Sequence, residues 1–273
     1  METLKGKNEI RMFRQVAEKI KGRLIKHEGV AGIIFIGGLT RRFADKYSDV
    51  DIIVLMSRKS KILRRKIKKI ADQEHSLSGL DIDLEAHSLE DFERTRWDEM
   101  DKWDFSHAEI VYDVNGEIRD LIKRKVKVSK GFWLKRIVVC GEYLKWYCCP
   151  PQKDVGTITE AWIDRGDLIS AHYCLNYSVD LMTQMIFALN KEFLPAPKWS
   201  VFYSQHLKWL PKNFKRLVEE ALTVRDLTTA ELNRRLRVLR RMWLDVLPKI
   251  KEETGLTPEL ISKRYVAMVL HQD

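Results

Sequence analysis

Two short apolar runs, IIFI (residues 33–36) and IIVL (residues 52–55), enclose the segment GGLTRRFADKYSDVD (residues 37–51). Each run is too short for a helix, is rich in β-branched or aromatic residues and is bounded by turn residues, which is typical of a buried strand. We therefore expect two strands of one sheet, with the glycine pair and the aspartates at one end of them. No other feature of the sequence limits the possible folds as strongly.

Two further strands and three helical or loop segments are expected before residue 120. Residues 80–87 (LDIDLEAH) alternate apolar and polar side chains, which predicts a strand with one acidic face. Residues 108–116 (AEIVYDVNG) predict a fourth strand that ends in an Asn-Gly turn. Apolar spacing of three and four predicts amphipathic helices at residues 8–26 and 58–70, and residues 88–105 form a polar helix or loop.

From about Glu117 onward the apolar spacing changes from two to 3.6 and stays there. Stretches separated by proline, glycine or threonine pairs predict a bundle of helices. The fold class is therefore α+β, with an N-terminal sheet and flanking helices at residues 1–120 and an all-α domain at residues 121–273. The predicted helical stretches are residues 116–126, 130–149, 157–193, 211–222, 229–254 and 257–270.

The composition favours an anionic partner and an intracellular protein. A net charge of +10 and a pI of about 9.3 suit a nucleic acid or a nucleoside triphosphate, and charge alone does not choose between them. No apolar run approaches the ~20 residues of a membrane helix and the first residues do not resemble a signal peptide, so we expect a cytoplasmic protein without a membrane partner. Four cysteines without Cys-x-x-Cys spacing indicate neither a zinc site nor a disulfide framework.

Eight basic residues between Arg58 and Lys69 surround an apolar stripe formed by Leu63, Ile67 and Ile70. We favour the interpretation that these cations form the solvated face of an amphipathic helix. A dedicated polyanion site is the alternative.

The glycine pair and the residues after it suit phosphate groups. Glycine lets backbone N–H groups approach phosphate oxygens closely because no Cβ intervenes. A hydroxyl and two guanidinium groups follow within four residues, and a serine leads into the second strand. The predicted nucleotide-binding residues are Gly37, Gly38, Thr40, Arg41, Arg42 and Ser48.

Asp49 and Asp51 lie two residues apart at the start of a strand, so their side chains project from the same face. Paired carboxylates suit hard divalent cations such as Mg²⁺. A third carboxylate is expected on the acidic face of residues 80–87, where Asp81, Asp83 and Glu85 all remain candidates. These aspartates are the predicted catalytic and metal-binding groups.

The segment FIGGLTRRFADKYSDVDIIVL (residues 35–55) resembles the signature of the DNA polymerase β-like nucleotidyltransferase superfamily, and the resemblance covers about residues 30–115. It implies a mixed sheet with flanking helices, Mg²⁺ as the metal, and transfer of a nucleoside monophosphate, most plausibly AMP from ATP, to a hydroxyl with release of pyrophosphate. By this resemblance Asp49 and Asp51 bind the metal. Alignment with the third-acid strand of aminoglycoside adenylyltransferases favours Asp81 as the third ligand, with Asp83 close behind.

Residues 164–199 (DRGDLISAHYCLNYSVDLMTQMIFALNKEFLPAPKW) are similar to the helical domain of small-molecule nucleotidyltransferases of the aminoglycoside and lincosamide type and of proteins with the domain of unknown function 4037. The similarity implies that residues 121–273 supply the acceptor pocket and favours a small hydroxyl-bearing acceptor. Acids near the starts of these helices are candidates for the general base or for partners of the helix dipole: Glu160, Asp164 and Asp167.

Two alternatives remain open. One is an RNA-binding or RNA-modifying nucleotidyltransferase, suggested by the basic helix and by a second group of arginines, Arg234, Arg235, Arg237, Arg240 and Arg241. The other is a catalytically silent nucleotide-binding regulator of the toxin–antitoxin kind, because Arg165 and His172 resemble the spaced Arg-His motif of helical ribonucleases that partner small nucleotidyltransferases.

Overall fold

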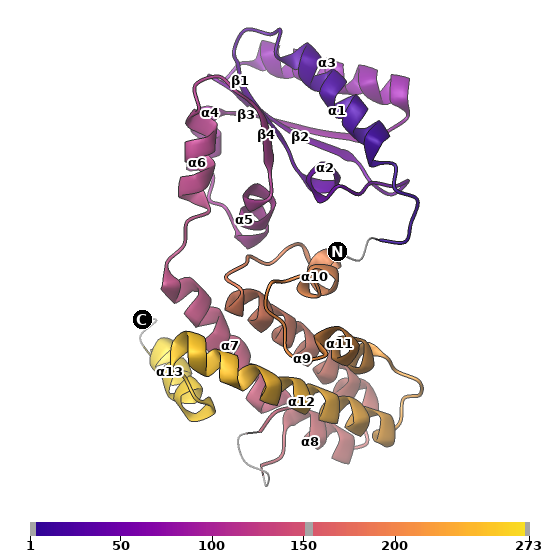
Figure 1. Cartoon of the computed structure of the whole chain (residues 1–273), viewed down its shortest axis with the longest axis vertical. Helices are drawn as coiled ribbons and strands as arrows, with labels where there is room; N and C mark the ends of the chain where they lie inside the picture. The colour runs from indigo at the N-terminus through magenta and orange to yellow at the C-terminus, as the bar shows by residue number, and fades with distance from the viewer. Residues whose placement is uncertain (1–3, 151–154, 271–273) are drawn as a thin grey trace. The chain divides into compact units, whose positions relative to one another are not determined.

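The computed structural model describes residues 4–150 and 155–270, and its contacts divide the chain into two compact units, Met1–Lys127 and Val128–Asp273 (Figure 1). The boundary that we expect from the sequence, between residues 120 and 121, falls inside helix α6 (Glu117–Lys125), and that helix belongs to the first unit. We call Met1–Lys127 the sheet unit and Val128–Asp273 the helical unit and describe each by itself.

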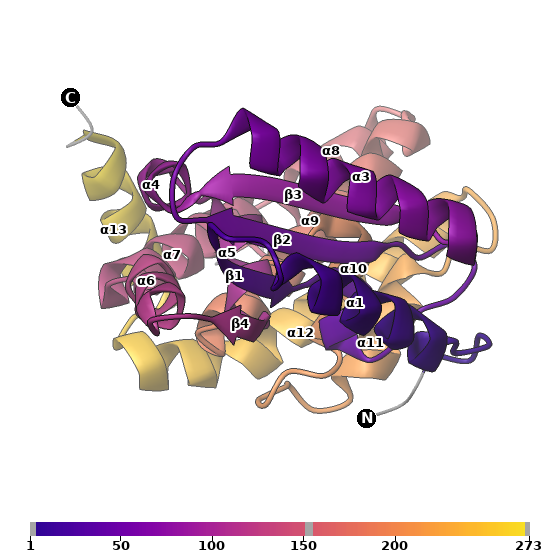
Figure 2. The ribbon, with the colours of Figure 1, turned by 90° about the horizontal axis from the view of Figure 1, so that it is seen from above.

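The sheet unit contains a four-stranded mixed sheet, as predicted. Its strand order is β3-β2-β1-β4, in which β1 is antiparallel to β2 and β4 and β2 is parallel to β3 (Figure 2). The strands are β1 (Val30–Phe35), β2 (Val50–Met56), β3 (Ile82–Ser88) and β4 (Glu109–Asp113). With α6, the helices are α1 (Ile10–Leu24), α2 (Gly37–Arg41), α3 (Lys61–Ser78), α4 (Leu89–Arg94) and α5 (Glu99–Ser106).

Two apolar cores cover the two faces of this sheet. Alternate residues of β2, such as Ile52 and Val54, pack with α1 and α3, which lie across one face in Figure 2. The intervening residues, Ile53 and Leu55, pack with side chains from α4, α5 and α6. Because side chains alternate along a strand, Asp51 projects toward the α4–α6 side. The acidic face of β3 therefore lies on the same side of the sheet as Asp51.

The structure differs from the sequence-based expectation at α2, where we expect only a Gly-Gly turn. Residues 37–41 form a short helix instead, and the Thr40 hydroxyl donates a hydrogen bond to the Gly37 carbonyl oxygen at 3.1 Å. The helix ends at Arg42, whose φ of 60° is left-handed. A helix of five residues is too short to produce an apolar period, so the sequence pattern did not indicate it.

The helical unit packs around α9, whose side chains are buried on most sides. None of the described helices of the chain combines the length and the apolar character that a membrane crossing requires. The helices of this unit are α7 (Lys130–Tyr147), α8 (Ile158–Asp164), α9 (Leu168–Leu189), α10 (Pro197–Ser204), α11 (Phe214–Leu222), α12 (Thr229–Thr254) and α13 (Pro258–Leu270).

Two details of the helical unit also differ from the expectation. Residues 157–193, expected as one helix, are divided at Gly166, which has a φ of +80° and ends α8. Asp167 then begins α9, because its carboxylate accepts a hydrogen bond from the Ser170 N–H at 3.0 Å. The helix α10, which starts with Pro197, lies outside the helical stretches that we expect.

Candidate active site

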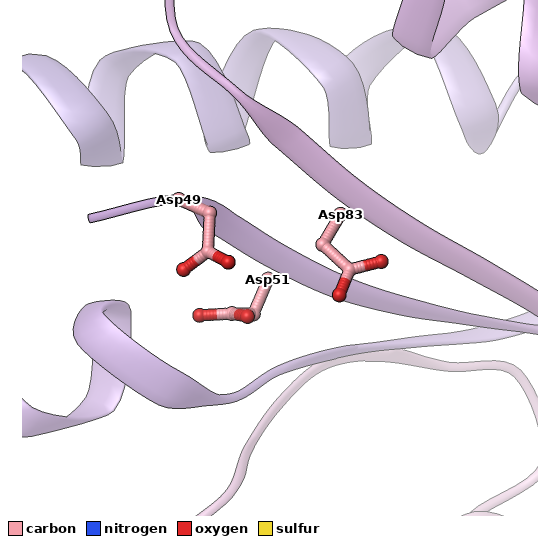
Figure 3. A group of neighbouring side chains, drawn as sticks. All are labelled: Asp49, Asp51 and Asp83. Carbon is pink, nitrogen blue, oxygen red and sulfur yellow. The ribbon is translucent and has the colours of Figure 1, made fainter. Parts of the chain in front are cut away.

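Three aspartates meet where β2 and β3 begin. Asp49 immediately precedes β2, Asp51 lies within it, and Asp83 lies in β3, where the parallel register places it directly opposite Asp51. One carboxylate oxygen from each of the three lies within 4.8 Å of the others, and Figure 3 shows the side chains turned toward a shared space. We call these three residues the acidic triad.

The resemblance favours Asp81 as the third acid, whereas this geometry favours Asp83. The side chain of Asp81 is 86% exposed and lies 3.7 Å from Nδ1 of His75, outside the triad. Asp81 precedes β3, and its contribution to the sheet is its carbonyl oxygen, which accepts a hydrogen bond from the Val50 N–H at 2.9 Å. Glu85 turns to His87, with Oε2 at 2.8 Å from Nε2. Of the three candidates, the register brings Asp83 to Asp51.

The acidic triad places three carboxylates close together. Burial, together with the charge of Asp49, raises the pKa of Asp51 to about 6, although Arg41 and a hydrogen bond from the Gly38 N–H act in the opposite direction. Partial loss of solvent raises the pKa of Asp83 as well, and so do the charges of Glu85 and Asp49. A divalent cation would relieve this repulsion, and carboxylate oxygens are the ligands that Mg²⁺ prefers. The residues present therefore fit such an ion.

The glycine pair has a structural reason that the sequence did not indicate. A Cβ atom on Gly37 would lie 1.8 Å from Oδ2 of Asp51, and the φ of Gly37 is +61°. The Gly38 N–H donates to the same oxygen at 3.4 Å. Gly37 thus leaves the space that the Asp51 carboxylate occupies, in addition to any access that it gives to phosphate groups.

The other predicted nucleotide-binding residues differ in their burial and in their contacts. Arg41 is half-buried in α2, and its charge lowers the pKa of Asp51, whereas Arg42 is exposed. The Ser48 hydroxyl donates to Oδ1 of Asp45 at 3.2 Å, which holds the loop before β2. Arg41 is thus the cation of the α2 segment that acts on the triad.

Three residues near the triad were missed by sequence reasoning. An open pocket of about 320 Å³ beside Asp49 and Asp83 is also lined by Asp72 and His75 of α3. Asp72 and His75 are three residues apart on a helix and therefore share one face. This spacing is the sequence signal that could have identified them. Asp104 of α5 is half-buried; burial raises its pKa, whereas the charge of Arg41 lowers it. Its signal was an acid in the last turn of a helix, where the dipole disfavours negative charge.

The candidate bases of the helical unit have structural partners. Glu160 accepts hydrogen bonds from Thr157 and lies 2.8 Å from Arg240, and these contacts hold its pKa below the ordinary value despite burial. Asp167 caps α9 through Ser170. Asp164 is exposed. The contacts of Glu160 and Asp167 favour the structural interpretation of these acids over the general-base interpretation.

The Arg165 and His172 pair is not brought together. The Arg165 guanidinium lies over the Trp162 ring, 4.9 Å from its centroid. His172 instead contacts Arg235, with 2.8 Å between Nδ1 and the guanidinium nitrogen, and burial followed by the Arg235 charge lowers its pKa. Arg235 is fully buried and also donates to the Ala221 carbonyl at 2.5 Å, so it is not the exposed arginine that the RNA-binding alternative would require.

Comparison with known proteins places the sheet unit in a family. Residues 17–128 match the family model of the nucleotidyltransferase domain. No curated protein sequence matches the chain. The chain thus carries a nucleotidyltransferase domain of the DNA polymerase β-like superfamily, as the resemblance predicts, and its fold is the α+β arrangement expected of that class of transferase.

Solved structures of low similarity also match. A nucleotidyltransferase-like protein from Exiguobacterium sibiricum 255-15 is 12% identical, with 88% of this chain and 77% of that chain covered and a TM-score of 0.42. A tri-AMPylated Shewanella oneidensis HEPN toxin in complex with MNT antitoxin matches at 16% identity and a TM-score of 0.30. The match covers 48% of this chain and 97% of that chain. A toxin–antitoxin structure with AMP-PNP matches at 15% identity and a TM-score of 0.33. The match covers 46% of this chain and 96% of that chain. These values are too low to add to the assignment, which rests on the family model.

Proposed function

We propose that the chain is a Mg²⁺-dependent nucleotidyltransferase that transfers a nucleoside monophosphate, AMP from ATP, to a hydroxyl of an acceptor and releases pyrophosphate. The observation that carries the proposal is the convergence of Asp49, Asp51 and Asp83 within a domain of the nucleotidyltransferase family. The choice of ATP is supported by the resemblance to adenylyltransferases.

Asp49, Asp51 and Asp83 would hold Mg²⁺. When bound, Mg²⁺ neutralises negative charge on the reacting phosphate groups and on the leaving pyrophosphate. Two glycines position the Asp51 carboxylate. Gly37 leaves room for it, and the Gly38 N–H donates a hydrogen bond to it. These contacts fix one carboxylate in position before any substrate arrives.

The residues around α2 would bind the triphosphate. By the resemblance, Gly37 and Gly38 at the start of α2 would lie against the triphosphate, Thr40 would add a hydroxyl, and Arg41 and Arg42 would add positive charge. Ser48 supports this site through the loop before Asp49. Binding and orientation of the triphosphate contribute to the rate because they replace a random encounter by a fixed geometry.

The helical domain, residues 121–273 by the sequence-based boundary, is proposed to bind the acceptor. The resemblance to small-molecule nucleotidyltransferases supports a small hydroxyl-bearing compound.

Release of pyrophosphate tests the proposal. The chain is incubated with Mg²⁺ and ATP, CTP, GTP or UTP, with and without aminoglycosides and lincosamides, and compared with Asp49→Asn/Asp51→Asn and with Asp81→Asn as the matched control. We expect release with ATP that is at least about 1,000-fold slower in the double variant, a loss of about 4 kcal/mol in transition-state stabilisation, and little changed in the control. Equal release by the double variant, or no release by the wild type with any nucleotide, would overturn the proposal.

A further inference from the structure

The first half of α3 carries an unusual concentration of positive charge. Residues 61–69 contain six cations, and the first acidic residue of the helix is Asp72. Leu63, Ile67 and Ile70 of α3 are buried in the core below, whereas the cations are exposed. We call these six residues the cationic half of α3: Lys61, Arg64, Arg65, Lys66, Lys68 and Lys69.

This arrangement disfavours the helix that carries it. Like charges four residues apart repel one another, and three such pairs occur: Lys61 with Arg65, Arg64 with Lys68, and Arg65 with Lys69. The cations also lie in the half of α3 that is nearer its N-terminus, the end where the macrodipole disfavours positive charge. A helix face that served only solubility would gain stability from interspersed glutamates, so the pattern calls for another explanation.

The neighbouring helix α1 shows how cations on the same sheet face are otherwise treated. Four of its five cations have acidic partners: Lys19 and Arg23 pair with Glu74, Lys21 with Glu18, and Arg14 with Glu109. In the cationic half of α3, Arg64 donates to the Ala86 carbonyl oxygen at 2.9 Å. Among residues 4–150 and 155–270, the other five side chains form neither an ion pair nor a hydrogen bond. Their charge is available to a partner.

The geometry selects a partner with regularly repeated negative charge. Positions four apart on a helix differ by about 6 Å along its axis, so the cations form a row about 12 Å long from Lys61 to Lys69. The apolar stripe of α3, which a membrane-inserted helix would need, is occupied by the core through Leu63 and Ile67. We propose that the cationic half of α3 docks the sugar–phosphate backbone of a nucleic acid strand.

The docked strand would lie close to the triad. Asp72 and His75, in the second half of α3, line the pocket that Asp49 and Asp83 also line. Lys69 precedes Asp72 by three residues, about 4.5 Å along the helix axis. Docking itself does not depend on nucleotidyl transfer, so the inference stands or falls independently of the proposed function.

Binding of labelled single-stranded RNA, with DNA of the same sequence as a second arm, tests the inference. Fluorescence polarisation is measured across a range of salt for the wild type, for Lys61→Gln/Arg65→Gln/Lys68→Gln, and for the matched control Lys251→Gln/Lys263→Gln/Arg264→Gln, which removes the same charge from exposed positions of α12 and α13. We expect at least a tenfold loss of affinity in the α3 variant alone. The slope of log K against log salt is expected to become shallower by about 2, because each lost contact to a single strand contributes about 0.7.

The outcomes separate the possible explanations. Weaker binding by the α3 variant, with a melting temperature no lower than that of the wild type, supports docking on α3 as opposed to loss of fold. Equal losses in both variants would show that net charge alone attracts the strand and would overturn the inference. Binding to phosphatidylserine vesicles without binding to RNA or DNA would overturn it in favour of a membrane surface. Retained RNA binding by Asp49→Asn/Asp51→Asn would show that docking is separate from the metal site.

Discussion

Two carboxylates of the sheet unit are both removed from water, at least in part, but their pKa values shift in opposite directions. Glu74 is 1% exposed, and burial alone would raise its pKa, but Lys19 and Arg23 contact it and bring that pKa below the ordinary value. Asp51 is also partly buried, yet its neighbours include Asp49 and Asp83, and its pKa rises to about 6. The chain supplies the counter-charge of Glu74 itself, whereas the carboxylates beside Asp51 raise its pKa further.

The comparison predicts that turnover slows strongly when an acid of the triad is replaced and little when a neighbouring acid outside the triad is replaced. Asp83→Asn should slow pyrophosphate release at least about 100-fold, which corresponds to about 2.7 kcal/mol, because it removes a ligand opposite Asp51. Asp81→Asn should stay within about threefold of the wild type, because Asp81 is exposed and outside the triad. A larger loss in Asp81→Asn than in Asp83→Asn would restore the assignment that the sequence resemblance favoured.

Asp51 should make the metal-free sheet unit less stable at neutral pH. Its pKa is about 6 in the folded chain against an ordinary value of 3.8, so the folded state holds the proton more tightly than the unfolded state. The associated stability is present below about pH 4 and is lost as pH rises through 6, by at most roughly 3 kcal/mol. Urea unfolding in the presence of a chelator, at pH 4.5 and 7.5, measures this loss.

The matched variant for this pH effect is Asp51→Asn, which cannot ionise. It should gain stability relative to the wild type as pH rises from 4.5 to 7.5. A difference between the two proteins that does not change with pH would show that Asp51 titrates normally.

Glu74 should behave in the opposite sense. Glu74→Gln leaves Lys19 and Arg23 without their buried partner, and we expect it to lower the free energy of unfolding of the sheet unit by about 2 kcal/mol. Glu18→Gln, at an exposed ion pair with Lys21, should change it by less than about 0.5 kcal/mol. Urea unfolding at pH 7 checks both values, and equal effects would remove the distinction between the two pairs.

Much of the sheet unit could be predicted from its sequence because the necessary signals are local. The β-rich runs at residues 33–36 and 52–55 and the alternation at residues 80–87 each identify a strand within a few residues. The spacing of Asp49 and Asp51 likewise identifies two acids on one face. The resemblance implies that the sheet is mixed, which no local pattern encodes, and the order of the strands comes from the structure.

The remaining details depend on contacts between distant segments. The choice of Asp83 over Asp81 is set by the parallel register of β2 with β3, and both residues look equivalent in an alternating strand. The requirement for Gly37 arises from the Asp51 carboxylate fourteen residues later. Arg235 is buried and contacts the carbonyl of Ala221 and the ring of His172, whereas its sequence alone groups it with the arginines that suggest RNA binding.

The central claim is that Asp51 and its neighbours bind a metal ion whereas Glu74 does not. Titration of Mn²⁺ into the protein, followed by electron paramagnetic resonance of the free ion, tests this directly. We predict binding by the wild type and by Glu74→Gln, and at least tenfold weaker binding by Asp51→Asn and Asp83→Asn. Wild-type affinity in Asp51→Asn, or an equal loss in Glu74→Gln, would contradict the account.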